Sequence, residues 1–169
     1  MEISLKGKRV LISGAAEGIG RATALSMHKL GAEVIICDIN EEKLSSMGKE
    51  IKTFVCDVSD SSKVDRMFKQ IENFGLDILL NSVIQMTTVF LPLLEKRPEA
   101  AIINTSSIFG LFSVPKQSIY NVGKFGVKAF TESLALEMEV SGSPVEVYCV
   151  FPGHIGTNIY SSSRFKSFD

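Results

Sequence analysis

The sequence predicts a single α/β domain in which a parallel sheet lies between two layers of helices, a doubly wound, three-layer αβα architecture. Short apolar runs alternate with segments of helical spacing along the chain. Most of these runs end at glycine or at a polar residue such as aspartate or asparagine. The chain has 169 residues, of which 45% are hydrophobic and 22% charged, which suffices for one domain with a substantial core.

Six apolar runs have the length of buried strands. They are residues Arg9–Ser13, Glu33–Cys37, Thr53–Cys56, Asp77–Leu80, Ala101–Thr105 and Val145–Phe151. Between them lie segments with the apolar spacing of helices, two of which stop before glycine, at Gly31 and Gly75. The predicted helices are Gly18–Leu30, Glu41–Gly48 with Asn40 as its cap, Ser61–Phe74, Val83–Leu94 and Gln117–Val140. Strands separated by helices in this way run parallel.

Composition excludes several classes of protein. The net charge is −1 and there is no basic block, so nucleic acid is not an expected partner. No apolar run is long enough to span a bilayer and the N-terminus has no signal-like segment, which predicts a soluble, cytoplasmic protein. Cys37, Cys56 and Cys149 lack CxxC spacing, so we expect buried thiols and no disulfide frame or metal site.

A glycine segment, Gly14-x-x-x-Gly18-x-Gly20, follows the first strand and opens the first helix. Gly14 permits a tight turn, Gly18 lets backbone approach a pyrophosphate, and Gly20 lets the helix pack close to the sheet. The helix N-terminus, at Gly18, Ile19 and Gly20, offers free N–H groups to phosphates. An ordinary strand–turn–helix is the alternative reading of these glycines, but the spacing favours a dinucleotide site.

Acidic residues follow the second and third strands. Asp38 comes eighteen residues after Gly20, where a carboxylate can accept hydrogen bonds from a ribose diol, although it can equally be a turn or capping residue. Glu17 lies in the glycine turn and is also acidic, so the two carboxylates would repel a 2′-phosphate. We therefore expect NAD rather than NADP. Asp57 and Val58 can contact the adenine, with an ordinary turn as the alternative.

Three residues in the second half of the chain suggest proton transfer. Tyr120 and Lys124 are four residues apart on a predicted helix and so share one face. A tyrosine hydroxyl ionises near pH ~10 in water, and an adjacent ammonium favours the phenolate, which can then exchange a proton with a substrate oxygen. Ser107 follows the fifth strand, at the carboxyl edge where ligands bind in this architecture, and can hold the same oxygen. Lys124 would also reach the nicotinamide ribose.

With these residues the chain resembles the classical short-chain dehydrogenase/reductase family, which has a Rossmann-type fold. The resemblance covers essentially the whole chain and implies that Ser107 orients a substrate carbonyl, Tyr120 is the general acid/base and Lys124 binds ribose. It also implies that Ile155 and Thr157 hold the nicotinamide carboxamide. The motifs that carry it are the glycine turn, Asp57, Asn81, Asn104-Thr105-Ser106-Ser107, Tyr120-x-x-x-Lys124 and Pro152-Gly153-x-Ile155-x-Thr157.

Two departures from the family pattern affect the domain assignment. Asn81-Ser82 runs directly into the apolar helix at Val83, where the family has a loop and another helix with a catalytic asparagine. The chain also stops at Asp169, where the family has a C-terminal cap. Either residues between Ser82 and Val83 and after Asp169 are missing from this sequence, which we favour, or the protein is a shortened form.

The expected function is an NAD(P)-dependent oxidoreductase that interconverts a secondary alcohol and a ketone. The apolar residues after Ser107 (Ile108, Phe109, Leu111, Phe112 and Val114) either line the pocket of an apolar substrate or pack beneath the site. The resemblance implies a homodimer or homotetramer through Val83–Leu94 and Gln117–Val140. Val89, Phe90, Leu134, Leu136 and Met138 are the interface candidates, and the alternative is that these helices are fully buried in the core. The alternatives are a truncated or non-catalytic NAD-binding module and an NAD-using epimerase or dehydratase.

Overall fold

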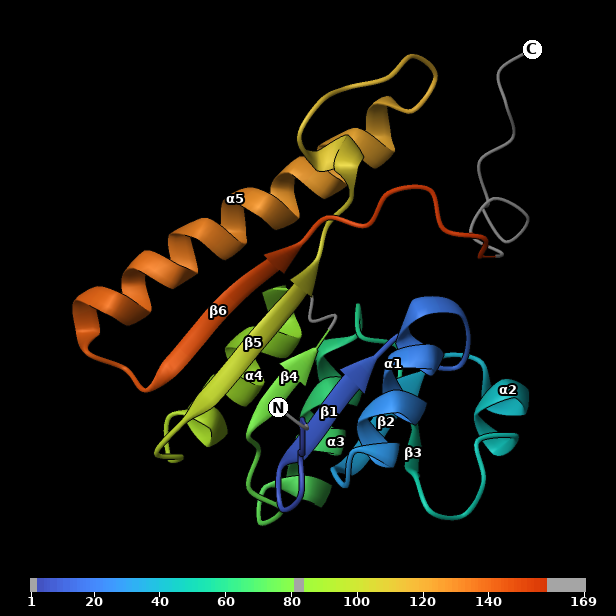
Figure 1. Ribbon diagram of the computed structural model, residues 1–169, viewed down its shortest axis with the longest axis vertical. Coiled ribbons are helices and arrows are strands. Elements are labelled where there is room, and N and C mark those ends of the chain that lie inside the picture. Colours follow the sequence, from blue (N-terminus) through green and yellow to red (C-terminus); the bar gives the residue numbers. More distant parts are fainter. Residues whose placement is uncertain (1–2, 81–83, 158–169) are drawn as a thin grey trace.

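The computed structural model describes residues 3–80 and 84–157, which form one six-stranded sheet in the order β3-β2-β1-β4-β5-β6 (Figure 1). All neighbouring strands are parallel. The strands are β1 (Arg9–Ser13), β2 (Glu33–Asp38), β3 (Lys52–Val55), β4 (Ile78–Leu80), β5 (Ala100–Thr105) and β6 (Val145–Val150). The helices are α1 (Gly18–Lys29), α2 (Glu41–Ser45), α3 (Ser61–Ile71), α4 (Ile84–Leu94) and α5 (Ser118–Ser141), with a short 3₁₀ turn, η1 (Ile108–Gly110).

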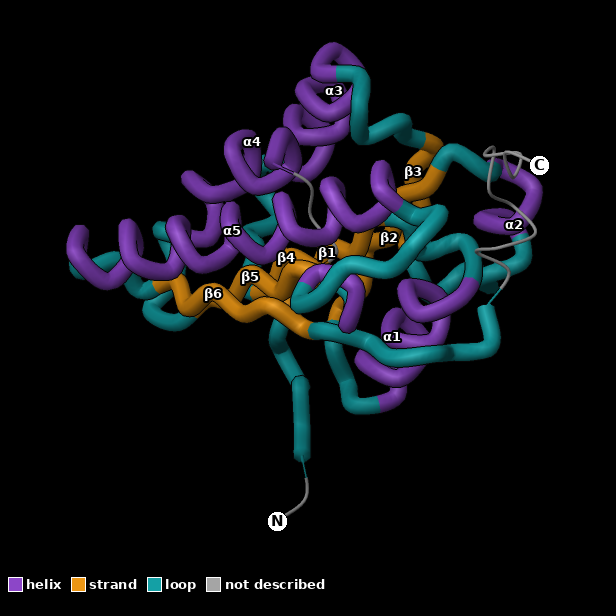
Figure 2. The backbone as a smooth tube through the Cα atoms, turned by 90° about the horizontal axis from the view of Figure 1, so that it is seen from above, coloured by secondary structure: helices purple, strands orange, loops and turns teal. Residues whose placement is uncertain are grey.

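The predicted αβα fold class is confirmed. Figure 2 shows α3, α4 and α5 on one face of the sheet and α1 on the other. Each predicted strand and helix is present, although α2 ends at Ser45 rather than Gly48. The side chains of Ser45 and Ser46 donate to the carbonyls of Glu42 and Lys43, a local bond that competes with continuation of the helix. Asn40 caps α2 as predicted, because its side chain accepts from the Lys43 N–H.

The core consists of two apolar clusters, one on each face of the sheet. The larger cluster joins α3, α4 and α5 to the sheet, and the smaller joins α1 and α2 to it. Phe90, Leu134 and Met138 are buried in the larger cluster, so their assignment to a subunit interface is wrong. Val89 is only partly buried and packs against the same cluster, whereas Leu136 is 62% exposed. The periodicity of the sequence identified the apolar positions of α4 and α5, but not which face of each helix packs against the sheet.

Parallel strands bring their carboxyl ends to one edge of the sheet, and the predicted site residues in the described part of the chain follow β1, β2, β3, β5 and β6 at this edge. Cys37 and Cys56 are buried and Cys149 is half-buried, and all three thiols are free. The described residues contain no cluster of side chains suited to a metal ion. Among the helices in residues 3–80 and 84–157, none combines the length and hydropathy needed to cross a membrane.

Candidate active site

The glycine turn between β1 and α1 has the geometry that its spacing predicts. Gly14 and Gly18 have φ angles of 63° and 59°, a region that favours glycine. A Cβ on Gly20 would lie 2.4 Å from the Gly14 carbonyl oxygen, so only glycine allows α1 to approach the turn this closely. The first backbone bond of α1 runs from the Arg21 N–H to the Glu17 carbonyl. The helix therefore leaves the N–H groups of Gly18, Ile19 and Gly20 available to phosphate oxygens.

Asp38 ends β2 directly beside this turn. One carboxylate oxygen accepts from the Ala16 N–H at 3.1 Å and the other from the Asn40 N–H at 3.0 Å. These backbone bonds fix the carboxylate between the turn and the start of α2 and leave it lone pairs for a ribose hydroxyl. Asp38 therefore also serves as a turn residue, the alternative role that the sequence left open.

Asp57 and Val58 follow β3 at the same edge of the sheet. The Asp57 carboxylate accepts from both the hydroxyl and the N–H of Ser59, at 2.6 and 3.0 Å. These two bonds hold the pKa of Asp57 below its usual value, and the bond from the hydroxyl contributes more than the bond from the N–H. Val58 packs against the larger core cluster. The pair thus forms an ordered turn, and its proposed contact with adenine stays a prediction.

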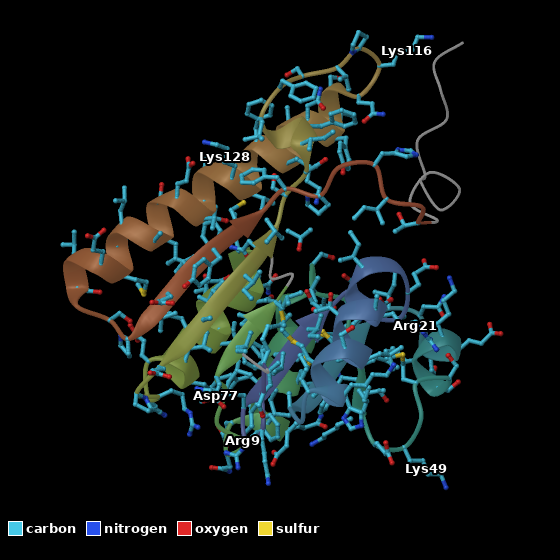
Figure 3. All side chains as sticks on the ribbon, viewed as in Figure 1. Arg9, Arg21, Lys49, Asp77, Lys116 and Lys128 are labelled. Carbon is cyan, nitrogen blue, oxygen red and sulfur yellow. The ribbon has the colours of Figure 1, made fainter. Side chains whose placement is uncertain are left out.

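Two cations near the glycine turn were not anticipated from the sequence. Lys43 of α2 forms an ion pair with Glu17 at 2.5 Å. The Arg21 guanidinium donates to the Ser46 hydroxyl at 2.9 Å, and Figure 3 shows Arg21 beside α2. The sequence analysis weighed only the carboxylates of Glu17 and Asp38 here, and the structure adds these two cations. Lys43 and Arg21 are remote from each other in sequence, and only the packing of α2 beside α1 brings them together.

Tyr120 and Lys124 lie on the first turns of α5 and share one face, as predicted. The Lys124 ammonium is 5.8 Å from the centre of the Tyr120 ring, within the range of a cation–π contact. It also donates to the Thr105 carbonyl at the end of β5, at 2.9 Å. Burial lowers the pKa of Lys124. The Tyr120 hydroxyl makes no hydrogen bond with the part of the chain that the structure describes.

Ser107 stands at the start of η1, close to the same part of α5. Its side-chain oxygen accepts from the Phe109 N–H at 3.2 Å, which leaves the hydroxyl proton free to be donated. The neighbouring Ser106 hydroxyl donates to the Lys124 carbonyl at 2.7 Å. A Cβ on Gly110 would lie 2.3 Å from the Ser106 hydroxyl oxygen and 2.9 Å from the Lys124 carbonyl oxygen. The absence of a side chain at Gly110 therefore lets η1 pack directly on α5, a requirement that the sequence analysis missed.

Aromatic and polar contacts support Tyr120 from the side of η1. The Phe109 and Tyr120 rings pack edge to face with centres 6.4 Å apart. Asn121 is 5% exposed and donates to the Val114 carbonyl, which ties the loop before α5 to its first turn. Its buried Oδ1 has no hydrogen-bond partner in the described residues. The sequence analysis did not single out Asn121, because an asparagine at a helix start has no distinctive pattern.

The segment after β6 joins the two halves of the site. The Pro152 carbonyl accepts from the Ile108 N–H at 3.1 Å, so this end of the segment rests on η1. At its other end, a Cβ on Gly18 would lie 3.5 Å from the Thr157 methyl carbon. Gly153 and Ile155 are exposed between these contacts. The structure thus brings Thr157 to the glycine turn, whereas Asn81 lies outside the described residues, as does the Ser82–Val83 junction.

Comparisons with known proteins agree with this geometry. A family model for short chain dehydrogenases matches two overlapping segments, residues 8–83 and 74–166. Human 15-hydroxyprostaglandin dehydrogenase (NAD+) is 34% identical over 191 residues, covering 94% of this chain and 72% of the human enzyme. The 3-oxoacyl-(acyl-carrier-protein) reductase FabG of Thermotoga maritima is 31% identical, with coverage of 90% and 76%. The chain therefore belongs to the short chain dehydrogenase family and is an oxidoreductase of that family.

Solved structures show the same fold. A short chain dehydrogenase/reductase from Burkholderia phymatum, crystallised in complex with NAD, superimposes with a TM-score of 0.88 at 26% identity. The match covers 96% of this chain and 71% of that one. A 3-ketoacyl-(acyl-carrier-protein) reductase from Brucella melitensis, crystallised with NADH, has a TM-score of 0.85 and shares the fold at 24% identity. The glycine turn therefore belongs to a Rossmann-type, NAD-binding fold.

Proposed function

We propose that this chain interconverts a secondary alcohol and a ketone with NAD as cofactor and Tyr120 as the general acid/base. The observation that carries the proposal is the position of Lys124, whose ammonium lies beside the Tyr120 ring and is anchored on the Thr105 carbonyl. A cation fixed there stabilises negative charge on the phenolate. Tyr120 can then accept the proton of a substrate alcohol, and in the reverse direction it donates that proton to the carbonyl oxygen.

Ser107 has the remaining capacity to hold the substrate oxygen. Its side-chain oxygen already accepts from the Phe109 N–H, and its own proton is available to another acceptor. The hydroxyl group would therefore donate to the substrate oxygen on which Tyr120 acts. The packing of η1 on α5 places Ser107 and Tyr120 on two elements in direct contact.

The residues fit a dinucleotide, because the glycine turn leaves N–H groups and open backbone where a pyrophosphate would lie. The cofactor supplies hydride acceptance and donation. Asp38 would hold the adenosine ribose, with Asp57 and Val58 beside the adenine. Lys124 would hold the nicotinamide ribose. Pro152 and Gly153 would shape the loop from which Ile155 and Thr157 contact the carboxamide.

The apolar surroundings of η1 favour an apolar substrate. Leu111 and Phe112 are each 52% exposed next to Phe109, and Phe109 and Phe112 pack edge to face. These side chains offer apolar area rather than charge to a bound alcohol or ketone. A panel that pairs bulky apolar ketones with small hydrophilic ones tests this part of the proposal, and better turnover of the hydrophilic ones would contradict it.

The Tyr120→Phe variant tests the catalytic assignment. Its kcat/KM for alcohol oxidation, followed by NADH absorbance, should fall by about a thousandfold, since general acid–base catalysis contributes about 10²–10⁴-fold. NADH affinity should not change. Tyr148→Phe is the matched control, because Tyr148 is exposed on β6 and bonds to Glu146, away from this site.

Three outcomes would contradict the proposal. Retention of more than about a tenth of the activity in Tyr120→Phe would remove Tyr120 from the chemistry. NADH binding without turnover of any substrate would indicate a non-catalytic NAD-binding module. Product formation with no net change in NADH would indicate an epimerase or dehydratase.

We also propose that the chain forms a homodimer or homotetramer through the outer faces of α4 and α5. Apolar side chains lie exposed there at Ile84, Val122, Phe125, Leu136 and Val140. Exposed apolar side chains on helix faces are typical of subunit interfaces. Light scattering should give a mass of two or four chains, and Leu136→Glu should yield the monomer. A monomeric wild-type protein would refute the assembly.

We propose further that the protein has residues between Ser82 and Val83 that this sequence lacks. Two facts support this. The family model matches in two separate segments, 8–83 and 74–166, the first of which ends at Val83. The alignment with the human enzyme spans 191 residues, more than the 169 of this chain. The intact mass of the natural polypeptide tests it. A mass near 18.5 kDa would contradict the proposal, and one several kilodaltons larger, about 110 Da per added residue, would support it.

A further inference from the structure

The Glu17–Lys43 ion pair connects the glycine turn to α2 at the position where an adenosine ribose would lie. Glu17 immediately precedes α1, yet its side chain makes no capping bond to that helix. It reaches Lys43 instead, and the two side chains stay 41% and 44% exposed. The pair is therefore accessible to a ligand that enters beside the turn.

This ion pair closes a ring of contacts that includes Asp38. The Asp38 carboxylate accepts from the N–H groups of Ala16 and Asn40, and the Asn40 side chain accepts from the Lys43 N–H. The Lys43 ammonium in turn forms the ion pair with Glu17, which is next to Ala16 in the sequence. Both ends of the ion pair are thus tied through short links to the carboxylate that we assign to the ribose.

Charged side chains of both signs lie at this turn. Glu17 and Asp38 are negative, and Lys43 and Arg21 are positive. Within the described residues, Arg21 donates to neutral partners, the Ser46 hydroxyl and, more distantly, the Ala16 carbonyl. Of these two cations, Lys43 is the one that pairs with a carboxylate. Removal of the Glu17 charge would leave Lys43 with an uncompensated ammonium on a flexible stem.

We propose that the Glu17–Lys43 ion pair determines which dinucleotide the chain accepts. With the pair intact, a ribose 2′-phosphate would face two carboxylates and a lysine already engaged by one of them. With the Glu17 charge removed, Lys43 can form a charge-assisted hydrogen bond to that phosphate. Glu17 therefore favours NAD by holding Lys43, as well as by its own charge. This inference rests on the proposed placement of the ribose at Asp38.

Calorimetric titration of NAD+ and NADP+ into four proteins tests the inference without relying on turnover. The proteins are the wild type, Glu17→Gln, Lys43→Met and the double variant. The wild type should prefer NAD+. In Glu17→Gln, NADP+ should bind more tightly, so the ratio of the two dissociation constants should shift toward NADP+ by about tenfold. This is the size of effect expected from one charge-assisted hydrogen bond. The double variant should lose most of this gain.

Glu42→Gln is the matched control, because Glu42 is exposed on the first turn of α2 and next to Lys43 in sequence. It makes the same change in net charge without breaking the ion pair, and should alter the ratio less than about twofold. The NADP+ affinity of Glu17→Gln should also fall more steeply with salt than its NAD+ affinity. Thermal melting confirms that each variant is folded.

The possible failures are distinguishable. If the folded wild type binds neither dinucleotide, both the proposed function and this inference fail. If it binds NAD+ but Glu17→Gln leaves the ratio unchanged, only this inference fails. If Glu42→Gln shifts the ratio of dissociation constants equally, the selectivity would come from the net charge around α2 and not from the ion pair. A gain that survives in the double variant would exclude Lys43 as the phosphate ligand.

Discussion

The two edges of the sheet use polar side chains differently. At the amino edge, both carboxylate oxygens of buried Asp77 are engaged: one accepts from the Arg97 guanidinium at 2.7 Å and the other from the Arg9 N–H at 2.8 Å. Figure 3 labels Arg9 and Asp77 at this edge. At the carboxyl edge, Glu17 and Lys43 form a half-exposed ion pair, and backbone groups hold the side chains of the proposed site. The Ala16 N–H binds Asp38, the Thr105 carbonyl binds Lys124, and the Phe109 N–H binds Ser107.

This difference separates stability from function. The Asp77 side chain is 3% exposed and both its oxygens are engaged, so it stabilises the fold and is not accessible to a ligand. A backbone contact orients a side chain while leaving some of its donors or acceptors unused. Changes at the amino edge should therefore affect unfolding, and changes at the carboxyl edge should affect binding and turnover.

The largest effect is expected for Asp77→Asn at the amino edge. An amide would direct an N–H toward the Arg97 guanidinium or the Arg9 N–H, and the loss of a buried charged partner costs about 3 kcal/mol. The melting temperature should fall by roughly 10 °C, while the NADH affinity of the folded protein should not change. Glu99→Gln breaks an exposed pair with Lys8 at the same edge and should cost below about 0.5 kcal/mol. If folded Asp77→Asn lost NADH affinity, the amino edge would affect ligand binding as well as stability, and the distinction between the two edges would be wrong.

Ser107→Ala should produce the reverse pattern at the carboxyl edge. Loss of a donor to the substrate oxygen should lower kcat/KM by about a hundredfold, as for similar donors elsewhere. The unfolding free energy should fall by only about 1 kcal/mol, because the side chain also caps η1. Ser113→Ala, at an exposed position in the following loop, is the control and should change neither quantity. Activity close to that of the wild type would remove Ser107 from the site.

Gly110→Ala should affect both stability and turnover, because it lies where a packing contact supports the site. The added Cβ would lie 2.3 Å from the Ser106 hydroxyl oxygen, and relief of such a contact costs about 1–3 kcal/mol. The shift of η1 on α5 should also lower kcat/KM, by about tenfold. Gly123→Ala on α5 meets nothing within 4 Å and should stabilise the protein by about 0.5–1 kcal/mol. Equal stability of the two variants would refute the close packing of η1 on α5.

Local patterns predicted most of the fold and part of the site. Apolar runs and the residues that end them gave the strands, because burial and chain reversal are short-range requirements. The spacing of Tyr120 and Lys124 gave their shared face, since four residues make about one helical turn. The Glu17–Lys43 pair was not predictable, because it depends on how α2 packs beside α1. The same reason explains the wrong interface residues: the buried face of α5, with Leu134 and Met138, is set by tertiary contacts.

The smallest effect concerns pH and the buried ammonium of Lys124. Burial lowers its pKa from the usual value near 10.5, so over the range between the two values the unfolded chain binds more protons than the folded one. Stability contributed by this group must therefore rise with pH across that range. In urea unfolding from pH 7 to 10, wild type should gain stability relative to Lys124→Met. Lys49→Met, which removes an exposed lysine, is the control for the change in net charge. A constant difference between wild type and Lys124→Met would mean that the ammonium is not desolvated, and its anchoring at the carboxyl edge would have to be reconsidered.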